Sequence, residues 1–168
     1  MKLQQLPYYL FLFLIVFAQQ SFGQKNDFDY NFKINDLKGN TIDFRTFKGK
    51  TVFINLWATW CGPCRGEMPS IQKLYEQVDK NEIEFVMLSI DNLKQTEKVK
   101  KYVNDKSFTF PVYTLSGEFN TLPEQLQVPS IPVTFIIDKN GTVVMKEVGM
   151  KNYNTSKMKK LLTELIKK

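Results

Sequence analysis

Short apolar runs alternate with amphipathic stretches along most of the chain. Residues 51–56 and 83–90 are apolar and rich in β-branched or aromatic side chains, which is typical of strands buried on both faces. Pro69 lies in a helical pattern that it should kink, and Asn154 or Thr155 should cap a closing helix. The apolar positions of these two predicted helices are Met68, Ile71, Leu74, Tyr75 and Val78 in the first, and Met158, Leu161, Leu162, Leu165 and Ile166 in the second.

Turn-rich segments predict two antiparallel hairpins. One spans residues 32–44, with Asn, Asp and Gly at its centre. The other joins residues 133–137 to residues 142–146 through a connection that ends in Asn140-Gly141, a favoured hairpin pair.

The remaining patterns complete an α/β domain. Residues 96–104 are expected to be helical, residues 110–113 to form a short strand, and residues 117–127 to be helical despite Pro123. A strand, helix and strand in succession predict parallel pairing with a right-handed crossover, and the later hairpin makes the sheet mixed. Because the strands are apolar throughout, we expect helices on both faces of this central sheet.

The N-terminus has the pattern of a secretory signal. Lys2 precedes an apolar run at residues 10–18, and Ser21 and Gly23 place small residues at the third and first positions before a cut at Gln24. The prediction is a signal peptide over residues 1–23 and one exported domain over residues 24–168, located in the periplasm or cell envelope.

An uncleaved membrane anchor is the alternative for this segment. A transmembrane helix needs about 20 apolar residues, whereas the stretch stops at Ala18 even when it is counted from Leu6. Contact with the membrane is expected only if this segment stays uncleaved.

The composition excludes several classes of function. The chain has no His, which removes Ser-His and Cys-His catalysis and metal sites built on imidazole. The formal net charge of +6 comes largely from lysines in helical segments without interleaved aromatic side chains, so no nucleic-acid partner is expected. No metal or cofactor is expected either, and the two cysteines allow at most one disulfide.

The two cysteines stand where redox chemistry is favoured. Cys61 and Cys64 follow a predicted buried strand and open a predicted helix, whose N-terminus lowers a thiol pKa from about 8.5 toward neutrality. We expect Cys61 to be the exposed nucleophile and Cys64 the resolving thiol that attacks the mixed disulfide. Gly62 leaves space for a partner, and Pro63 supplies a helix-compatible φ in the first turn.

Three other roles for the cysteine pair compete with this one. The pair could supply two of the four ligands of a zinc site, but the chain has no other Cys and no His to supply the rest. A pair of core cysteines does not need Gly-Pro between them. A permanent structural disulfide that closes so short a loop removes little chain entropy.

The sequence Trp-Ala-Thr-Trp-Cys-Gly-Pro-Cys at residues 57–64 resembles the active-site motif of the thioredoxin superfamily. The following Arg-Gly-Glu-Met-Pro and the export signal resemble the TlpA/ResA-like branch of exported thiol-disulfide oxidoreductases. The resemblance extends over residues 32–168 in element order and implies a thioredoxin-like fold with an N-terminal β-hairpin extension. It also implies that Trp60 forms part of the partner-facing rim and that Trp57 is a core residue.

A second segment carries the same resemblance. Residues 128–138 are similar to the cis-proline segment of the superfamily. By this likeness, Ile131-Pro132 is a cis bond beside the disulfide and contributes to substrate binding with Trp60, Gly62 and Pro63. An ordinary trans proline that opens a strand is the alternative.

One departure from the superfamily concerns proton transfer. Thioredoxins carry a buried acid at the position that matches Asn55, and an amide cannot titrate. Members of the exported branch resemble this chain in having an acid shortly after the second cysteine, here Glu67. A partly buried Glu67 has a raised pKa and passes protons to and from Cys64; an exposed acid that favours the helix dipole is the alternative.

The resemblance implies a reductant of envelope proteins. Cys-Gly-Pro-Cys is the thioredoxin motif, and thioredoxin lies at the reducing end of the range, at about −270 mV. The expected substrates are oxidised envelope proteins, including cytochrome c apoproteins, with a membrane thiol-disulfide shuttle as electron donor. An oxidase or isomerase, a peroxide reductase, and a non-catalytic module that binds Cu(I) or thiols remain as alternatives.

Overall fold

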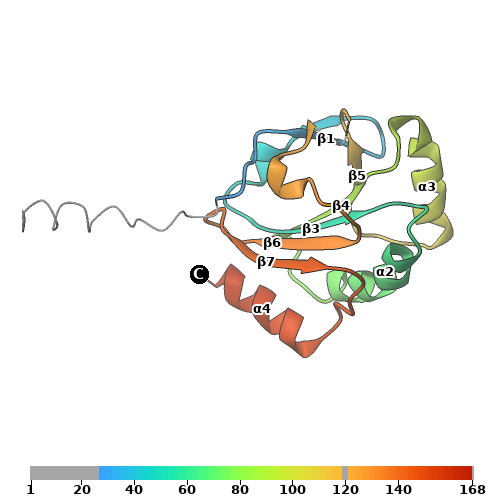
Figure 1. Ribbon diagram of the computed structural model, residues 1–168. Coiled ribbons are helices and arrows are strands. Elements are labelled where there is room, and N and C mark those ends of the chain that lie inside the picture. Colours follow the sequence, from blue (N-terminus) through green and yellow to red (C-terminus); the bar gives the residue numbers. More distant parts are fainter. Residues whose placement is uncertain (1–26, 119–120, 168) are drawn as a thin grey trace, which may run out of the picture.

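A computed structural model describes residues 27–118 and 121–167 of the chain (Figure 1). The predicted signal segment, residues 1–23, and the predicted start of the domain at Gln24 lie outside the described residues. No helix in the described part of the chain has the length and apolar character needed to cross a membrane.

Seven strands and three α-helices make up the regular structure of the described residues. The strands are β1 (Lys33–Asp36), β2 (Thr41–Asp43), β3 (Thr51–Trp57), β4 (Ile83–Ser89), β5 (Val112–Leu115), β6 (Val133–Ile137) and β7 (Val143–Val148). The helices are α2 (Gly62–Tyr75), α3 (Thr96–Asp105) and α4 (Ser156–Ile166), with short 3₁₀ helices η2 (Phe44–Phe47), η3 (Leu93–Gln95) and η5 (Glu124–Leu126).

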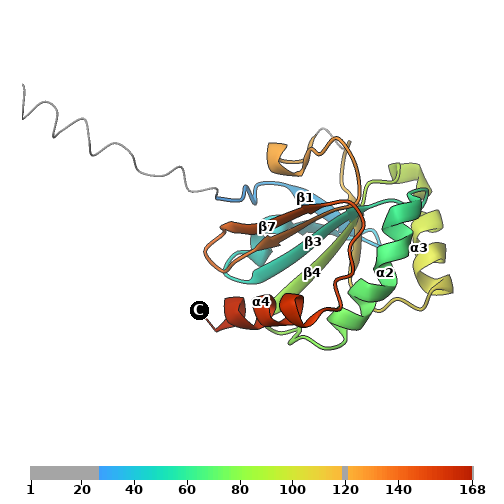
Figure 2. The ribbon, with the colours of Figure 1, turned by 60° about the horizontal axis from the view of Figure 1, so that its bottom comes forward.

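The strands form one mixed sheet in the order β2-β1-β5-β4-β3-β6-β7. Helices α2 and α4 pack on the same face of this sheet, the face turned toward the viewer in Figure 2. Strand β4 pairs in parallel with β3 and with β5. The other neighbouring strands of the sheet are antiparallel. The predicted βαβ unit, both hairpins and the mixed α/β sheet are therefore confirmed.

The sheet separates two apolar clusters, and β3 contributes to both. Phe53 and Trp57 point to the face where α2, α3 and α4 pack, whereas Val52, Ile54 and Leu56 point to the other face. The expectation of α-helices on both faces is wrong, because an aromatic N-terminal segment and the 3₁₀ helices η2 and η5 cover the second face. Four aromatic side chains of this second face surround Phe44. Phe32 stacks face-on against it and Phe47 meets it edge-on, whereas Phe28 and Tyr30 are tilted.

Two other predictions need correction. The described part of residues 117–127 contains no α-helix and only short 3₁₀ structure such as η5, because Pro123 lacks an N–H and disfavours helical geometry at the residue before it. The strand expected at residues 110–113 begins later and forms β5, after Pro111.

The predicted helix around Pro69 and the predicted cap of the closing helix are confirmed. Pro69 lies inside α2 without ending it, and the expected kink stays a prediction. Thr155 is the cap of α4, since its side chain accepts a hydrogen bond of 3.2 Å from the Met158 N–H.

Strand register brings two distant segments to one end of the sheet. In the antiparallel pairing of β3 with β6, Leu56 lies opposite Val133. The residues that follow β3 therefore lie beside the residues that precede β6. The predicted cysteine motif and the predicted cis-proline segment meet there.

Candidate active site

Cys61 and Cys64 form a disulfide at the first turn of α2, with their Cα atoms 5.3 Å apart. Cys61 is the N-cap residue, and the Cys64 N–H donates a hydrogen bond of 3.2 Å to Cys61 Sγ. The exposed fraction is 6% for Cys61 and 0% for Cys64. Cys61 is therefore also buried, contrary to the expectation of an exposed cysteine, although it keeps a small exposed area that Cys64 lacks.

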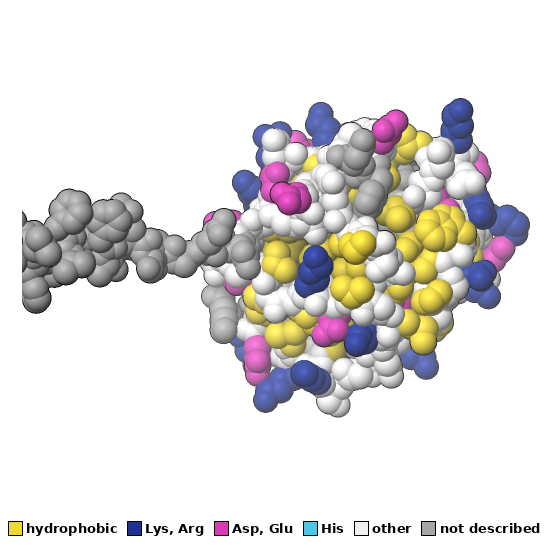
Figure 3. Space-filling model, in the orientation of Figure 1, with side chains coloured by type: hydrophobic (Ala, Val, Ile, Leu, Met, Phe, Trp, Pro, Cys, Tyr) yellow, Lys and Arg dark blue, Asp and Glu magenta, His cyan; other side chains and the backbone are white. Residues whose placement is uncertain are grey.

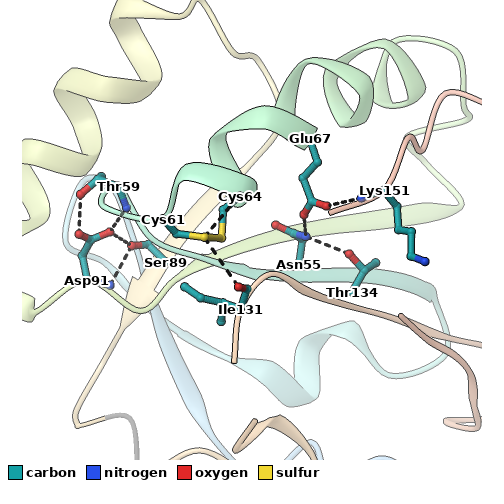
Figure 4. The surroundings of a disulfide bond; sticks show 10 residues. All are labelled: Asn55, Thr59, Cys61, Cys64, Glu67, Ser89, Asp91, Ile131, Thr134 and Lys151. Atoms are coloured by element: carbon teal, nitrogen blue, oxygen red, sulfur yellow. Dashed lines mark hydrogen bonds between the residues drawn. A yellow bond between two sulfur atoms is a disulfide. The ribbon is translucent and has the colours of Figure 1, made fainter. Parts of the chain in front are cut away.

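The Ile131–Pro132 bond is cis, as the resemblance implies. The Ile131 carbonyl oxygen lies 3.8 Å from Cys61 Sγ, so the backbone before β6 borders the Cys61 sulfur (Figure 4). In the reduced protein the Cys61 thiol can donate to this carbonyl.

The immediate surroundings of the disulfide are open and apolar. Trp60 is 61% exposed, and Gly62 and Pro63 are exposed on the first turn of α2. A Cβ at Gly62 would meet no atom within 4 Å, so the fold itself does not require glycine at this position. Figure 3 shows apolar side chains gathered at the end of the sheet where α2 begins.

Glu67 lies one turn beyond Cys64 and is only 1% exposed. Its Oε1 accepts a hydrogen bond of 2.7 Å from Asn55 Nδ2, and its Oε2 accepts one of 3.1 Å from the Lys151 backbone N–H. Burial raises the pKa of Glu67 from 4.5 to about 7, although both hydrogen bonds act in the opposite direction. Of the two alternatives for Glu67, the structure shows the buried acid.

The loop after β7 connects Glu67 to the cis-proline segment, and sequence reasoning missed it. The Gly149 N–H donates to the Pro132 carbonyl at 2.8 Å, two residues before the Lys151 N–H that binds Glu67. The exposed Met150 lies between them against α2, where a Cβ at Gly66 would approach its sulfur to 2.8 Å. Backbone donors carry no residue-type signal, so the sequence pattern could not indicate this contact.

A second buried carboxylate, Asp91, holds the loop before the disulfide. Asp91 accepts hydrogen bonds from the Thr59 N–H at 2.7 Å, the Thr59 hydroxyl at 2.6 Å and the Ser89 hydroxyl at 2.8 Å (Figure 4). Its exposed fraction is 2%. Sequence reasoning missed this cluster, although an acid directly after the strand at residues 83–90 was a usable signal.

The described residues contain no group of three or more His, Cys, Asp or Glu side chains placed to hold a metal ion. The chemistry that the site can perform is that of its sulfur pair and of the buried acid beside it.

The fold and the site together define a thioredoxin-like protein with a disulfide at the start of helix α2. The sequence matches the Redoxin family over residues 24–162, and the chain belongs to that family. Relatives named ResA that are 35% and 30% identical, and of which the chain covers 74% and 82%, show that it belongs to the ResA-like branch of this family.

Two relatives of this name illustrate the extent of the match. The thiol-disulfide oxidoreductase ResA of a Bacillus cereus strain is 38% identical over 120 residues, which are 71% of this chain and 66% of that protein, just under two thirds of its length. ResA of Halalkalibacterium halodurans is 30% identical over 151 residues, which are 90% of this chain and 82% of that protein.

Solved structures support the same fold. StoA of Bacillus subtilis superposes with a TM-score of 0.62 at 22% identity, over 80% of this chain and 94% of that one. A secreted disulfide oxidoreductase of Mycobacterium tuberculosis has a TM-score of 0.65 at 18% identity, over 79% of this chain and 97% of that one.

The raised pKa of Glu67 predicts a pH dependence of stability. Between pH 4.5 and about 7 the unfolded carboxyl ionises while the folded one keeps its proton, so the free energy of unfolding should fall with rising pH. The loss should level off above this range at about 3 kcal/mol, because one pKa unit corresponds to about 1.4 kcal/mol. Urea denaturation across this pH range checks it.

The Glu67→Gln protein should lack this part of the slope, whereas Glu164→Gln, which alters an exposed carboxyl on α4, should keep it. Identical slopes in the wild type and Glu67→Gln would contradict the assignment.

Proposed function

We propose that this protein reduces disulfides of other envelope proteins through the Cys61–Cys64 pair. The observation that carries the proposal is the unequal burial of two bonded cysteines at a helix N-terminus, since Cys61 keeps a small exposed area and Cys64 is fully enclosed. A substrate can reach only Cys61, and Cys64 can react only within the protein. This asymmetry is what a nucleophile and a resolving thiol require.

The reaction begins with the reduced pair. The Cys61 thiolate attacks a substrate disulfide, one substrate sulfur leaves and takes up a proton, and a mixed disulfide remains on Cys61. Cys64 then gives its proton to Glu67 and attacks Cys61 Sγ. The second substrate sulfur leaves as a thiolate and takes up a proton. The substrate gains two electrons and two protons overall, and the protein ends as the disulfide seen here.

Glu67 suits the role of proton acceptor because of its position and its pKa. It is buried one helical turn from Cys64, and a pKa of about 7 lets it accept and release a proton near neutral pH. Solvent has little access to Cys64, which makes an internal base necessary.

The residues around Cys61 bind the substrate. The exposed Trp60, Gly62 and Pro63 lie on one side of the sulfur, and the Ile131–Pro132 segment borders the other. A substrate segment between them would contact apolar surface and the Ile131 backbone.

The cellular setting follows from the relatives and the N-terminal pattern. The relatives are named thiol-disulfide oxidoreductases, and one protein of the same fold is described as secreted. With a signal cleaved before Gln24, the protein would act in the periplasm or cell envelope, receive electrons from a membrane thiol-disulfide shuttle, and reduce proteins such as cytochrome c apoproteins.

Replacing one cysteine at a time should separate the two sulfur roles. Cys64→Ser should accumulate mixed disulfides on Cys61, because the resolving step is removed, and Cys61→Ser should abolish insulin reduction. Non-reducing electrophoresis with mass spectrometry identifies the trapped proteins. An active Cys61→Ser protein, together with a Cys64→Ser protein that traps nothing, would refute the assignment.

The role of Glu67 should appear in the pH dependence of the resolving step. In Glu67→Gln this step should slow about 10²-fold or more at neutral pH, as expected when a general base is lost, and its dependence on an ionisation near pH 7 should disappear. Stopped-flow measurement of mixed-disulfide resolution checks it, with Glu164→Gln as the matched control. An unchanged pH–rate profile would mean that Glu67 takes no part.

The direction of exchange should be set by the reduction potential. Equilibration with glutathione should give a value near that of thioredoxin, about −270 mV, since the Cys-Gly-Pro-Cys sequence is the same. A value near about −120 mV, as for DsbA, would instead favour an oxidase.

Tight binding of one Cu(I) ion without insulin reduction would favour the copper-carrying alternative.

A further inference from the structure

Asn55 lies in the middle of β3 with an exposed fraction of 0%, and its amide is only half satisfied. Nδ2 donates to Glu67 Oε1 at 2.7 Å and to Thr134 Oγ1 at 2.9 Å. Oδ1 has no hydrogen-bond partner among the residues that the structure describes. A buried acceptor without a partner costs free energy, so its presence requires an explanation.

The orientation of the amide follows from its neighbours. Ionised Glu67 only accepts hydrogen bonds, and both of its oxygens do so here, Oε1 from Asn55 Nδ2 and Oε2 from the Lys151 N–H, so the nitrogen of Asn55 faces Glu67. Oδ1 is thereby turned away from Glu67 and Thr134. In Figure 4 it lies on the side of the amide that faces the Cys61–Cys64 disulfide.

Reduction of the disulfide creates the missing donor. A disulfide sulfur carries no hydrogen, whereas reduced Cys64 carries an S–H group that water cannot easily reach, because its exposed fraction is 0%. Cys64 and the β3 residues on either side of Asn55, Phe53 and Trp57, belong to the same buried cluster beneath α2.

We propose that Asn55 is a positioning residue whose Oδ1 accepts a hydrogen bond from the Cys64 thiol in the reduced protein, while Nδ2 keeps its hydrogen bond to Glu67. A single amide then holds the resolving thiol and its base in fixed relation. The inference rests on the proposed function, because it takes Cys64 as the resolving thiol and Glu67 as the base.

Two consequences follow from this arrangement. The hydrogen bond exists only in the dithiol state, so it stabilises the reduced pair relative to the disulfide. It also favours the protonated thiol, so it raises the pKa of Cys64 and keeps this sulfur unreactive until a mixed disulfide forms on Cys61.

The other charged groups near Glu67 do not interfere. The Lys151 ammonium turns away from Glu67 in Figure 4 and pairs with Glu147 at 3.5 Å. Burial raises the pKa of Tyr153 far above its usual value, so its hydroxyl stays neutral. Glu67 is therefore the charge that has to be controlled in an experiment.

The test uses the Cys64 pKa in a protein that already carries Cys61→Ser and Glu67→Gln, read from the ultraviolet absorbance of the thiolate. In this background Asn55 can act on Cys64 only directly. Asn55→Leu should lower the Cys64 pKa because the acceptor is lost, and Asn55→Asp should raise it because an acceptor with a charge remains. Unchanged values in both variants, or shifts in the same direction, would overturn the proposal.

The matched control is Thr51→Val. Thr51 lies at the far end of the same strand, is also fully buried, and also has an unpartnered side-chain oxygen in the described structure. Thr51→Val should leave the Cys64 pKa unchanged. If it shifts this pKa as much as Asn55→Leu does, the effect comes from a general change in β3.

Two further measurements need no triply substituted protein. In otherwise unaltered protein, Asn55→Leu should shift the equilibrium with glutathione about fivefold toward the disulfide, since a neutral hydrogen bond contributes about 1 kcal/mol. In the wild type, the carboxamide carbon of Asn55 should move downfield in NMR spectra on reduction, and should not do so in Cys64→Ala. An unmoved resonance on reduction would overturn the proposal even if the variants did not fold.

The outcome is separable from that of the proposed function. If the wild type reduces insulin and Cys64→Ser traps substrates while the Asn55 measurements fail, only the role of Asn55 is refuted. If trapping and insulin reduction both fail, the proposed function is refuted whatever Asn55 does.

Discussion

Strand β3 is the constraint on which the rest of the structure depends. All of its residues are fully buried, and it pairs with β4 on one edge and β6 on the other, so its position and register leave no freedom. Its end at Trp57 fixes where the cysteine loop begins, and its antiparallel register with β6 fixes where the Ile131–Pro132 bond lies. The geometry of the active site is therefore set by sheet pairing.

Burying Asn55 in this strand determines the polar groups around it. An amide inside an apolar layer needs partners, which Glu67 supplies from α2 and Thr134 from β6. The buried Glu67 carboxylate needs donors in turn, and the Lys151 backbone provides the second one. Asp91 differs, because three donors from Thr59 and Ser89 surround it and it serves to hold the loop.

Periodicity predicts the strands, the helices and the cysteine pair because each has a local pattern. It fails at residues 117–127, where Pro123 limits helix formation, and for the second face of the sheet, where aromatic side chains replace helices. The resemblance supplied the cis bond, which no local pattern indicates. The contacts of Glu67 with Asn55 and Lys151 depend on residues 12 and 84 positions away, and one donor is a backbone group without a residue-specific signal.

The polar groups of the site lower the stability of the fold that holds them. Asn55 Oδ1 is buried without a partner in the described structure, and Glu67 is kept in a layer that disfavours its charge. Such features persist only where the surrounding packing outweighs them. The two apolar clusters on either side of β3 provide that packing, and they belong to the same strand that carries the amide. Because the strand cannot shift without disturbing both clusters, Asn55 and Glu67 cannot relax toward solvent, and the acid keeps a pKa that suits proton exchange with a buried thiol.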